Sequence, residues 1–72
     1  MEIDRYSVRI WWSDEDGAFL AKIPELPGCL ADGETQEEAL RNVRAVARIW
    51  IDTAREMGRG VPAPQSETVA AA

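Results

Sequence analysis

The 72-residue sequence contains no histidine, and Cys29 is its only cysteine. A lone cysteine excludes an internal disulfide, and without histidine the chain lacks the commonest transition-metal ligand and the usual general base near neutral pH. No apolar run approaches the ~20 residues that span a bilayer, and the acidic start Met1–Asp4 is unlike a secretory signal peptide. We therefore expect one small cytoplasmic domain with no metal, no cofactor and no membrane association.

Basic side chains are also few, eight against 13 acidic ones, which gives a formal net charge of −5. Residues 1–38 carry ten acidic and three basic side chains, whereas residues 39–72 carry three acidic and five basic ones. Nonspecific nucleic-acid binding depends on neutralising phosphates with lysine and arginine, so this balance argues against direct DNA binding. The acidic first half instead favours a basic protein partner.

A chain this short can build only a small core. Folding at this size buries only about 60% of the surface that the unfolded chain exposes, and such domains usually need a further source of stability. With a disulfide and a metal excluded, self-association or a bound partner remains. We therefore expect a homo-oligomer, either a dimer or a tetramer.

Two segments with alternating apolar residues, 6–12 and 18–23, predict a β-hairpin. The sequence Asp-Glu-Asp-Gly at 14–17 predicts a four-residue turn with Gly17 in the left-handed region. Pairing Ser13 with Ala18 then gathers large apolar residues on one face, which we expect to be the core face: Val8, Ile10, Trp12, Phe19, Ala21 and Ile23. The other face carries two cross-strand pairs, Trp11 with Leu20 and Arg9 with Lys22.

The second half of the sequence predicts a short strand at 29–31 and one long helix at 36–57. Thr35 and Glu38 form a capping box at the start of the helix, and Gly58 ends it. The apolar stripe that should face the sheet is Ala39, Val43, Val46, Ala47, Trp50, Ala54 and Met57, flanked by Leu40 and Ile51.

The fold class is therefore predicted to be α+β, with a small antiparallel sheet of three to four strands packed on one main helix in the order β-β-β-α-β. Residues 59–64 are the candidate fourth strand, at a sheet edge because they contain proline. Residues 1–64 form the predicted domain, and residues 65–72 are predicted to be a disordered tail.

Asp14, Glu15 and Asp16 are the best candidates for carboxylate chemistry, since a nuclease site needs acids that converge on Mg²⁺. Contiguous acids in one turn point in different directions, so turn formation is the favoured interpretation, followed by contact with a partner. Cys29 has no histidine to activate it, which favours a buried structural thiol. Arg41, Arg44, Arg48 and Arg55 form a basic helix face, for which solvation is favoured over a protein or nucleic-acid contact.

Trp11 differs from Trp12 and Trp50, which we expect in the core. The register turns Trp11 outward beside Leu20, and an outward aromatic residue with an aliphatic neighbour is typical of an interface. The alternative is that a further strand covers it. The predicted partner or oligomer interface comprises Arg9, Trp11, Leu20, Asp14, Glu15, Asp16 and Glu25.

Several motifs occur at a specific spacing: Asp14-Glu15-Asp16-Gly17, then Pro24-Glu25-Leu26-Pro27-Gly28-Cys29, then Gly33-Glu34-Thr35-x-Glu37-Glu38-Ala39, and Pro62-x-Pro64. Over residues 5–64 this pattern resembles the HicB-type antitoxin family. The resemblance implies a partial ribonuclease H-like fold that has lost the nuclease carboxylates. It also implies a partner, a small basic HicA-type toxin that cleaves mRNA. The Ala-rich end differs from the carboxy-terminal DNA-binding domain that family members usually carry, so no operator binding is expected of this chain.

The sequence and the resemblance leave two candidate functions, one of a binding protein and one of an enzyme. The first is a non-enzymatic binding module that neutralises a basic toxin by masking its active surface. The alternative is a solitary domain of the same fold with residual metal-dependent nuclease activity at Asp14, Asp16 or other acids. The first is favoured, because neither long strand carries an acid at its middle.

Overall fold

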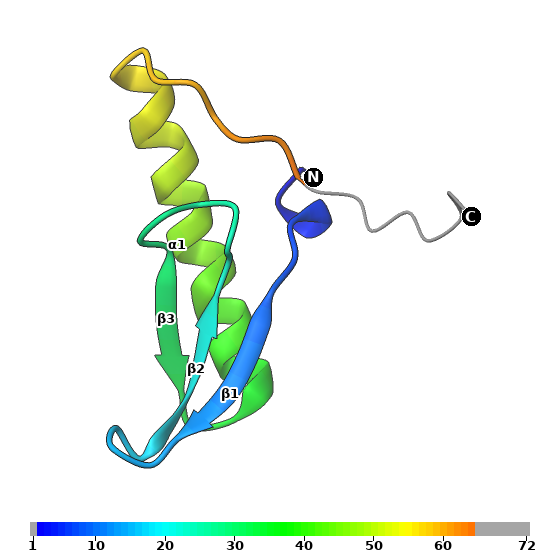
Figure 1. The fold of residues 1–72 in the computed structure, drawn as a ribbon, viewed down its shortest axis with the longest axis vertical. Coiled ribbons are helices and arrows are strands. Elements are labelled where there is room, and N and C mark those ends of the chain that lie inside the picture. The colour runs from blue at the N-terminus through cyan, green and yellow to red at the C-terminus, as the bar shows by residue number, and fades with distance from the viewer. Residues whose placement is uncertain (1, 65–72) are drawn as a thin grey trace, which may run out of the picture.

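The computed structural model describes residues 2–64 as a sheet with a long helix against it. The elements in chain order are a short 3-10 helix η1 (Glu2–Arg5), strands β1 (Arg9–Ser13), β2 (Ala18–Lys22) and β3 (Leu30–Gly33), and helix α1 (Gln36–Glu56). The strands form one antiparallel sheet in the order β1-β2-β3, and α1 lies across one face of it (Figure 1). The predicted α+β class is confirmed.

The β1–β2 hairpin has the predicted register. The cross-strand partners are Ser13 with Ala18, Trp12 with Phe19, Trp11 with Leu20, Ile10 with Ala21 and Arg9 with Lys22. Gly17 has a positive φ of 60°, and its N–H donates to the Ser13 carbonyl oxygen at 2.9 Å. Glycine adopts this left-handed conformation without a steric penalty, which explains its place at the end of the turn.

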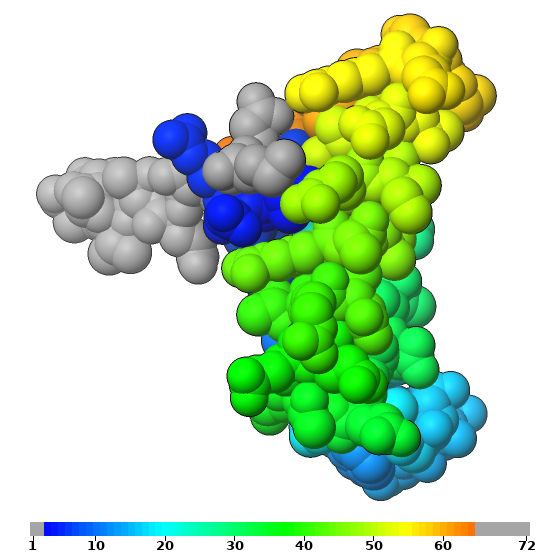
Figure 2. Space-filling view, turned by 180° about the vertical axis from the view of Figure 1, so that it is seen from behind, coloured from blue at the N-terminus to red at the C-terminus, as the bar shows by residue number. Residues whose placement is uncertain are grey.

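Trp12 does not lie in the core, so the prediction for this residue is wrong. Its side chain is 50% exposed, although it lies on the helix-facing side of the sheet beside Phe19. The hairpin tip projects past the first turn of α1 (Figure 2), and the helix therefore does not cover it. Alternation of apolar residues indicates the face of a strand but not how far the covering helix extends.

Helix α1 begins and ends as the sequence predicts. Thr35 Oγ1 accepts a hydrogen bond from the Glu38 N–H at 3.0 Å. The Glu38 carboxylate reaches one residue further back than the capping box requires and accepts from the Glu34 N–H at 2.7 Å. At the other end, Gly58 has a φ of 72° and donates its N–H to the Arg55 carbonyl oxygen at 3.1 Å.

The core lies between α1 and the sheet. Its buried side chains are Ile3, Tyr6, Ala21, Ile23, Leu26, Cys29, Ala39, Val43, Ala47 and Ile51. The predicted helix stripe needs two corrections, because Ile51 is buried and Met57 is 60% exposed. The last turns of α1 extend beyond the ends of the strands (Figure 1), so no sheet lies beneath Met57.

Residues 59–64 do not form the predicted fourth strand. Within residues 2–64 the sheet consists of β1, β2 and β3. Pro62 and Pro64 have no amide hydrogen to donate to a strand ladder. The segment is held by side chains instead: the Tyr6 hydroxyl donates to the Pro62 carbonyl oxygen, and Val61 packs against the core. The predicted disordered tail lies outside the described residues.

Candidate functional site

Acidic side chains from two separate segments of the chain lie at one end of the molecule. Strands β1 and β3 run in the same direction, so the β1–β2 turn and the β3–α1 connection lie at the same end of the sheet (Figure 1). These segments and the first turn of α1 carry six carboxylates, here named the acidic end: Asp14, Glu15, Asp16, Glu34, Glu37 and Glu38. All except Glu38 are exposed. The amino-terminal dipole of α1 favours negative charge beside it, which offsets part of the repulsion.

The carboxylates of the hairpin turn are bonded to separate partners. Asp14 Oδ1 accepts from the Trp12 indole N–H at 2.9 Å, and Asp16 Oδ2 accepts from the Ser13 hydroxyl at 2.7 Å. Within residues 2–64 no group of three or more histidine, cysteine, aspartate or glutamate side chains is placed to hold a metal ion. The turn therefore presents its acids as a charged surface.

Trp12 places an apolar group within this acidic end. The hydrogen bond to Asp14 and an edge-on contact with Phe19, at 5.0 Å between ring centroids, fix the orientation of the half-exposed indole. An exposed tryptophan with a fixed orientation buries a large area when a partner covers it, which is why tryptophan is common among anchor residues of interfaces. The alternation of apolar residues along β1 assigns Trp12 to the core, so the sequence does not reveal it as a surface residue.

The second exposed surface is the sheet face opposite α1, here named the open face. Ala21 and Ala31 are partners on the helix side, so the alternate residues of each strand point away from the helix. They are Arg9, Trp11 and Ser13 of β1, Ala18, Leu20 and Lys22 of β2, and Leu30 and Asp32 of β3. The structure thus brings the predicted interface residues Arg9, Trp11 and Leu20 together, as the register indicates.

Leu30 extends the apolar part of the open face. It pairs with Lys22 and is 51% exposed, whereas Trp11 and Leu20 are partly buried. Trp11, Lys22 and Leu30 line a hollow of about 410 Å³ together with residues of the β2–β3 connection, namely Ile23, Pro24, Leu26, Pro27, Gly28 and Cys29. Leu30 is not among the interface residues predicted from the sequence, although the burial expected for Cys29 implies by alternation that Leu30 points outward.

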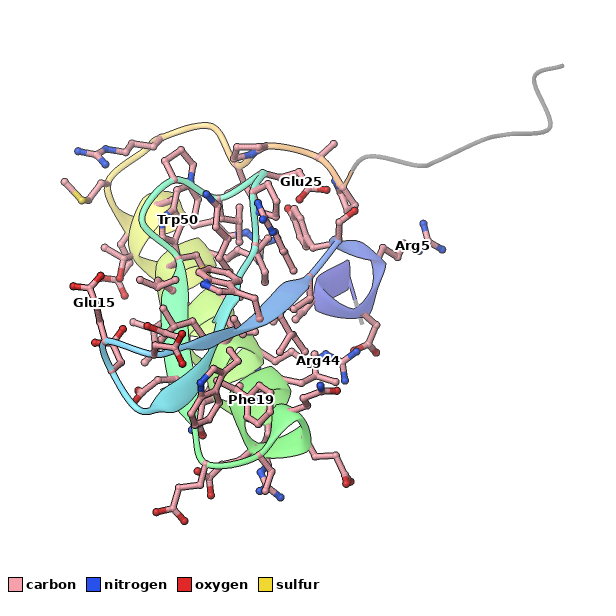
Figure 3. The ribbon with its side chains drawn as sticks, turned by 60° about the horizontal axis from the view of Figure 1, so that its bottom comes forward. Arg5, Glu15, Phe19, Glu25, Arg44 and Trp50 are labelled. Carbon is pink, nitrogen blue, oxygen red and sulfur yellow. The ribbon has the colours of Figure 1, made fainter. Side chains whose placement is uncertain are left out.

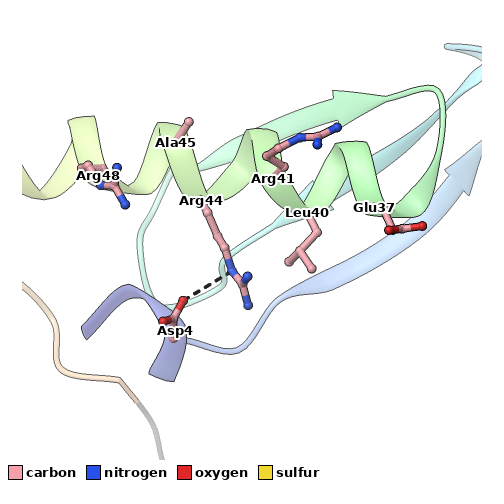
Figure 4. Close-up of a pocket in the computed structure, with 7 residues that line it drawn as sticks. All are labelled: Asp4, Glu37, Leu40, Arg41, Arg44, Ala45 and Arg48. Carbon is pink, nitrogen blue, oxygen red and sulfur yellow. Dashed lines mark ion pairs between the residues drawn. The ribbon is translucent and has the colours of Figure 1, made fainter. Parts of the chain in front are cut away.

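The basic face of α1 lies on the other side of the molecule. Arg41, Arg44 and Arg48 line a shallow hollow of about 580 Å³ together with Asp4 and Glu37 (Figure 4). Arg44 Nε lies 3.8 Å from Asp4 Oδ1, an ion pair that connects η1 to α1. Both partners are substantially exposed, and exposed ion pairs contribute little to stability. The two acids offset part of the positive charge here.

Glu25 is not brought to the acidic end. It follows the opposite end of β2, and Figure 3 shows its side chain far from Glu15 of the hairpin turn. Glu25 Oε2 accepts from the Ser7 N–H at 3.4 Å, which joins the β2–β3 connection to the segment before β1. The proposed grouping of Glu25 with the turn acids therefore has no geometric support.

Cys29 is buried, as predicted. Its Sγ lies 3.8 Å from the Val43 carbonyl oxygen, and burial raises the pKa of the thiol above its ordinary value. A thiol with a raised pKa is neutral at physiological pH and a poor nucleophile. Cys29 serves the packing between β3 and α1.

The fold and these surfaces define a small α+β domain whose described chemical features are surface charge and exposed apolar side chains. The chain belongs to the HicB-like antitoxin family: residues 6–72 match the family described as the HicB-like antitoxin of bacterial toxin-antitoxin systems. This family is generally non-catalytic, and an antitoxin implies a toxin partner.

Curated proteins of similar length are related to this chain in sequence. A UPF0150 protein of Thermoplasma acidophilum is 34% identical over 65 residues, which cover 90% of this chain and 93% of the relative. A UPF0150 protein of Synechocystis is 42% identical over 52 residues, 72% of this chain and 71% of the relative. No solved structure matches the chain significantly. Among the described residues, no helix has the length and apolar character needed to cross a membrane.

Proposed function

We propose that this chain is a non-enzymatic binding module that neutralises a basic HicA-type, mRNA-cleaving toxin in the cytoplasm by masking the toxin's active surface. The observation that carries the proposal is the acidic end, where six carboxylates from two segments gather at one end of the molecule with the half-exposed Trp12. A ribonuclease that binds RNA needs a basic surface, and a cluster of fixed carboxylates competes with phosphate for it.

The roles of the two kinds of group differ. The carboxylates of Asp14, Glu15 and Asp16 steer a basic partner and accelerate its association, because long-range attraction acts before contact. Trp12 acts after contact, since a buried aromatic anchor mainly slows dissociation. Trp11 was the anchor expected from sequence, but its neighbours Arg9 and Lys22 on the open face would repel a basic toxin.

The fold supports the non-enzymatic part of the proposal. Membership of the HicB-like family is the ground for regarding the sheet and helix as a partial ribonuclease H-like fold. Strands β1 and β2 contain no acidic residue that could serve as a nuclease carboxylate. The strand β3 contains Asp32, which lies on the open face opposite Leu20.

The test is the association rate of a HicA-type toxin encoded beside this chain, measured over a salt series. The variant Asp14→Asn/Glu15→Gln should associate more slowly and with a weaker salt dependence than the wild type. The matched control Asp52→Asn/Glu56→Gln removes the same charge from the other end of α1 and should change the rate much less. If both double variants behave alike, or the rate is insensitive to salt, the acidic end is not the toxin surface.

A further inference from the structure

The open face has the composition of an interface rather than of a solvated sheet face. Antiparallel sheets that face water on one side normally alternate apolar and polar residues, with the polar ones outward. Here Trp11 and Leu20 are direct cross-strand partners pointing outward, and Leu30 lies on the same face with half of its surface exposed. Three adjoining apolar side chains on a face that α1 does not cover call for a partner.

The open face carries charges of both signs, so it suits a second copy of itself better than a partner that is uniformly basic or acidic. Arg9 and Lys22 are cross-strand partners at one end of the face, and the Arg9 guanidinium stacks on the Trp11 ring at 5.4 Å from its centroid. Asp32 lies on β3, opposite Leu20, one row nearer the hairpin end. The same face therefore carries positive charge at one side of its apolar centre and negative charge at another.

This arrangement is self-complementary under two-fold symmetry. In a two-fold dimer every contact occurs twice, so if Lys22 of one copy meets Asp32 of the second copy, Asp32 of the first meets Lys22 of the second. Leu20 and Leu30, the cross-strand partners of Asp32 and Lys22, then lie near the symmetry axis, with Trp11 beside Leu20, and are buried by the same residues of the other copy. Lys22, whose cross-strand partner Arg9 carries a like charge, gains an opposite charge in this way.

We infer that the open face is the interface of a two-fold dimer of this chain, in which Lys22 of each copy pairs with Asp32 of the other across an apolar centre of Trp11, Leu20 and Leu30. A basic toxin is a poor occupant because Arg9 and Lys22 would repel it. A nucleic acid is a poor occupant because Asp32 and the net charge of −5 oppose phosphates. The inference is independent of the proposed toxin, since it concerns the pure chain alone.

The decisive experiment is a charge swap read out by sedimentation over a concentration series of the full chain. Lys22→Glu and Asp32→Lys should each weaken dimerisation by about tenfold or more, because each places like charges together twice. The double variant Lys22→Glu/Asp32→Lys should recover the wild-type dimer, since the pair is restored in reverse. Arg41→Glu on the basic face of α1 is the matched control and should leave dimerisation unchanged.

Lys22 and Asp32 are exposed in the single chain, so we expect the substitutions to leave folding intact. Lys22→Glu places a carboxylate beside Arg9, and the contact from Asn42 Nδ2 at 2.8 Å is to the backbone oxygen of Asp32. Leu30→Ser should also weaken the dimer, whereas Ile49→Ser, which removes a 65% exposed aliphatic residue from α1, should not. A monomeric wild type, or a double variant no better than the single ones, would overturn the inference. So would single-stranded RNA binding that is lost in Lys22→Glu.

Discussion

A Cβ atom on Gly33 would lie 2.5 Å from the backbone nitrogen of Ala39 and 2.9 Å from its Cα. Gly33 ends β3, Ala39 lies in the first turn of α1, and both residues are buried. Because the obstructing atoms belong to the backbone, no side-chain rotation relieves such a contact. The missing side chain of Gly33 therefore sets how closely the helix approaches the sheet.

Gly33→Ala is accordingly expected to destabilise the fold by about 1–3 kcal/mol, the usual range for overpacking a buried site. The measurement is the free energy of unfolding by chemical denaturation. Gly60→Ala serves as the control, because a Cβ there meets no atom within 4 Å and its φ lies outside the left-handed region. An equal change in the free energy of unfolding at the two glycines would show that the close approach of Gly33 to Ala39 does not contribute to stability.

Thr35→Ala should lower stability by about 0.5–2 kcal/mol, since it removes the hydroxyl that accepts the Glu38 N–H. The helix should also fray at its first turn, which hydrogen exchange of the Glu38 amide detects. Thr53→Ala is the control in the interior of the same helix, where alanine is the better helix former. Faster exchange is expected in Thr35→Ala alone.

Cys29 should react with a thiol reagent slowly in the folded protein and rapidly once the protein is unfolded, because burial both shields the thiol and raises its pKa. The raised pKa also makes the stability depend on pH. The folded state holds the thiol proton more tightly than the unfolded state does. The associated stability is therefore complete below the unfolded thiol pKa and is lost as the pH rises through the higher pKa of the folded state.

The comparison that isolates this effect is the pH dependence of unfolding in the wild type and in Cys29→Ala. Cys29→Ala should be less stable at neutral pH, where it loses the packed sulfur, and its stability should decline less steeply in alkaline solution. Parallel pH profiles of the two proteins would mean that the thiol does not contribute to the alkaline loss of stability.

Trp12→Ser and Trp11→Ser form a matched pair on opposite faces of β1. Trp12→Ser should increase the dissociation rate of the toxin by at least about tenfold, as expected for an interface anchor. Trp11→Ser should weaken the dimer but leave toxin dissociation nearly unchanged. Surface plasmon resonance measures the first quantity and sedimentation the second. A reversed pattern would place the toxin on the open face and contradict the separation of the two surfaces.

The sequence predicted the local features of this fold well because each depends on a few neighbouring residues. The Asp-Glu-Asp-Gly turn determined the hairpin register from Arg9–Lys22 to Ser13–Ala18, and Thr35 with Glu38 determined the start of α1. Misassigned features depend on where elements end relative to one another. Trp12 is exposed because the hairpin extends past the helix, and Met57 because the helix extends past the sheet.

For the candidate surfaces too, the sequence reveals what depends on local register and not what depends on how separate elements are placed. The outward pair Trp11 and Leu20 follows from the register alone and was found from sequence. The sequence reveals the acidic end only in part, because the turn acids and Glu37 are separated in the chain. Their segments come to the same end of the sheet only because β1 and β3 run in the same direction. Glu25 was grouped with the turn acids by its charge, whereas it lies at the opposite end of β2.

The most direct test of the proposed antitoxin function is RNA cleavage by the HicA-type toxin as increasing amounts of this chain are added. We predict that cleavage stops when the chain is equimolar with the toxin, that the chain alone leaves RNA intact in Mg²⁺ or Mn²⁺, and that Asp14→Asn/Glu15→Gln requires more protein for the same inhibition. Undiminished cleavage at excess chain would contradict it. RNA cleavage by the chain itself that disappears in Asp14→Asn or Asp16→Asn would contradict it as well and identify a nuclease instead.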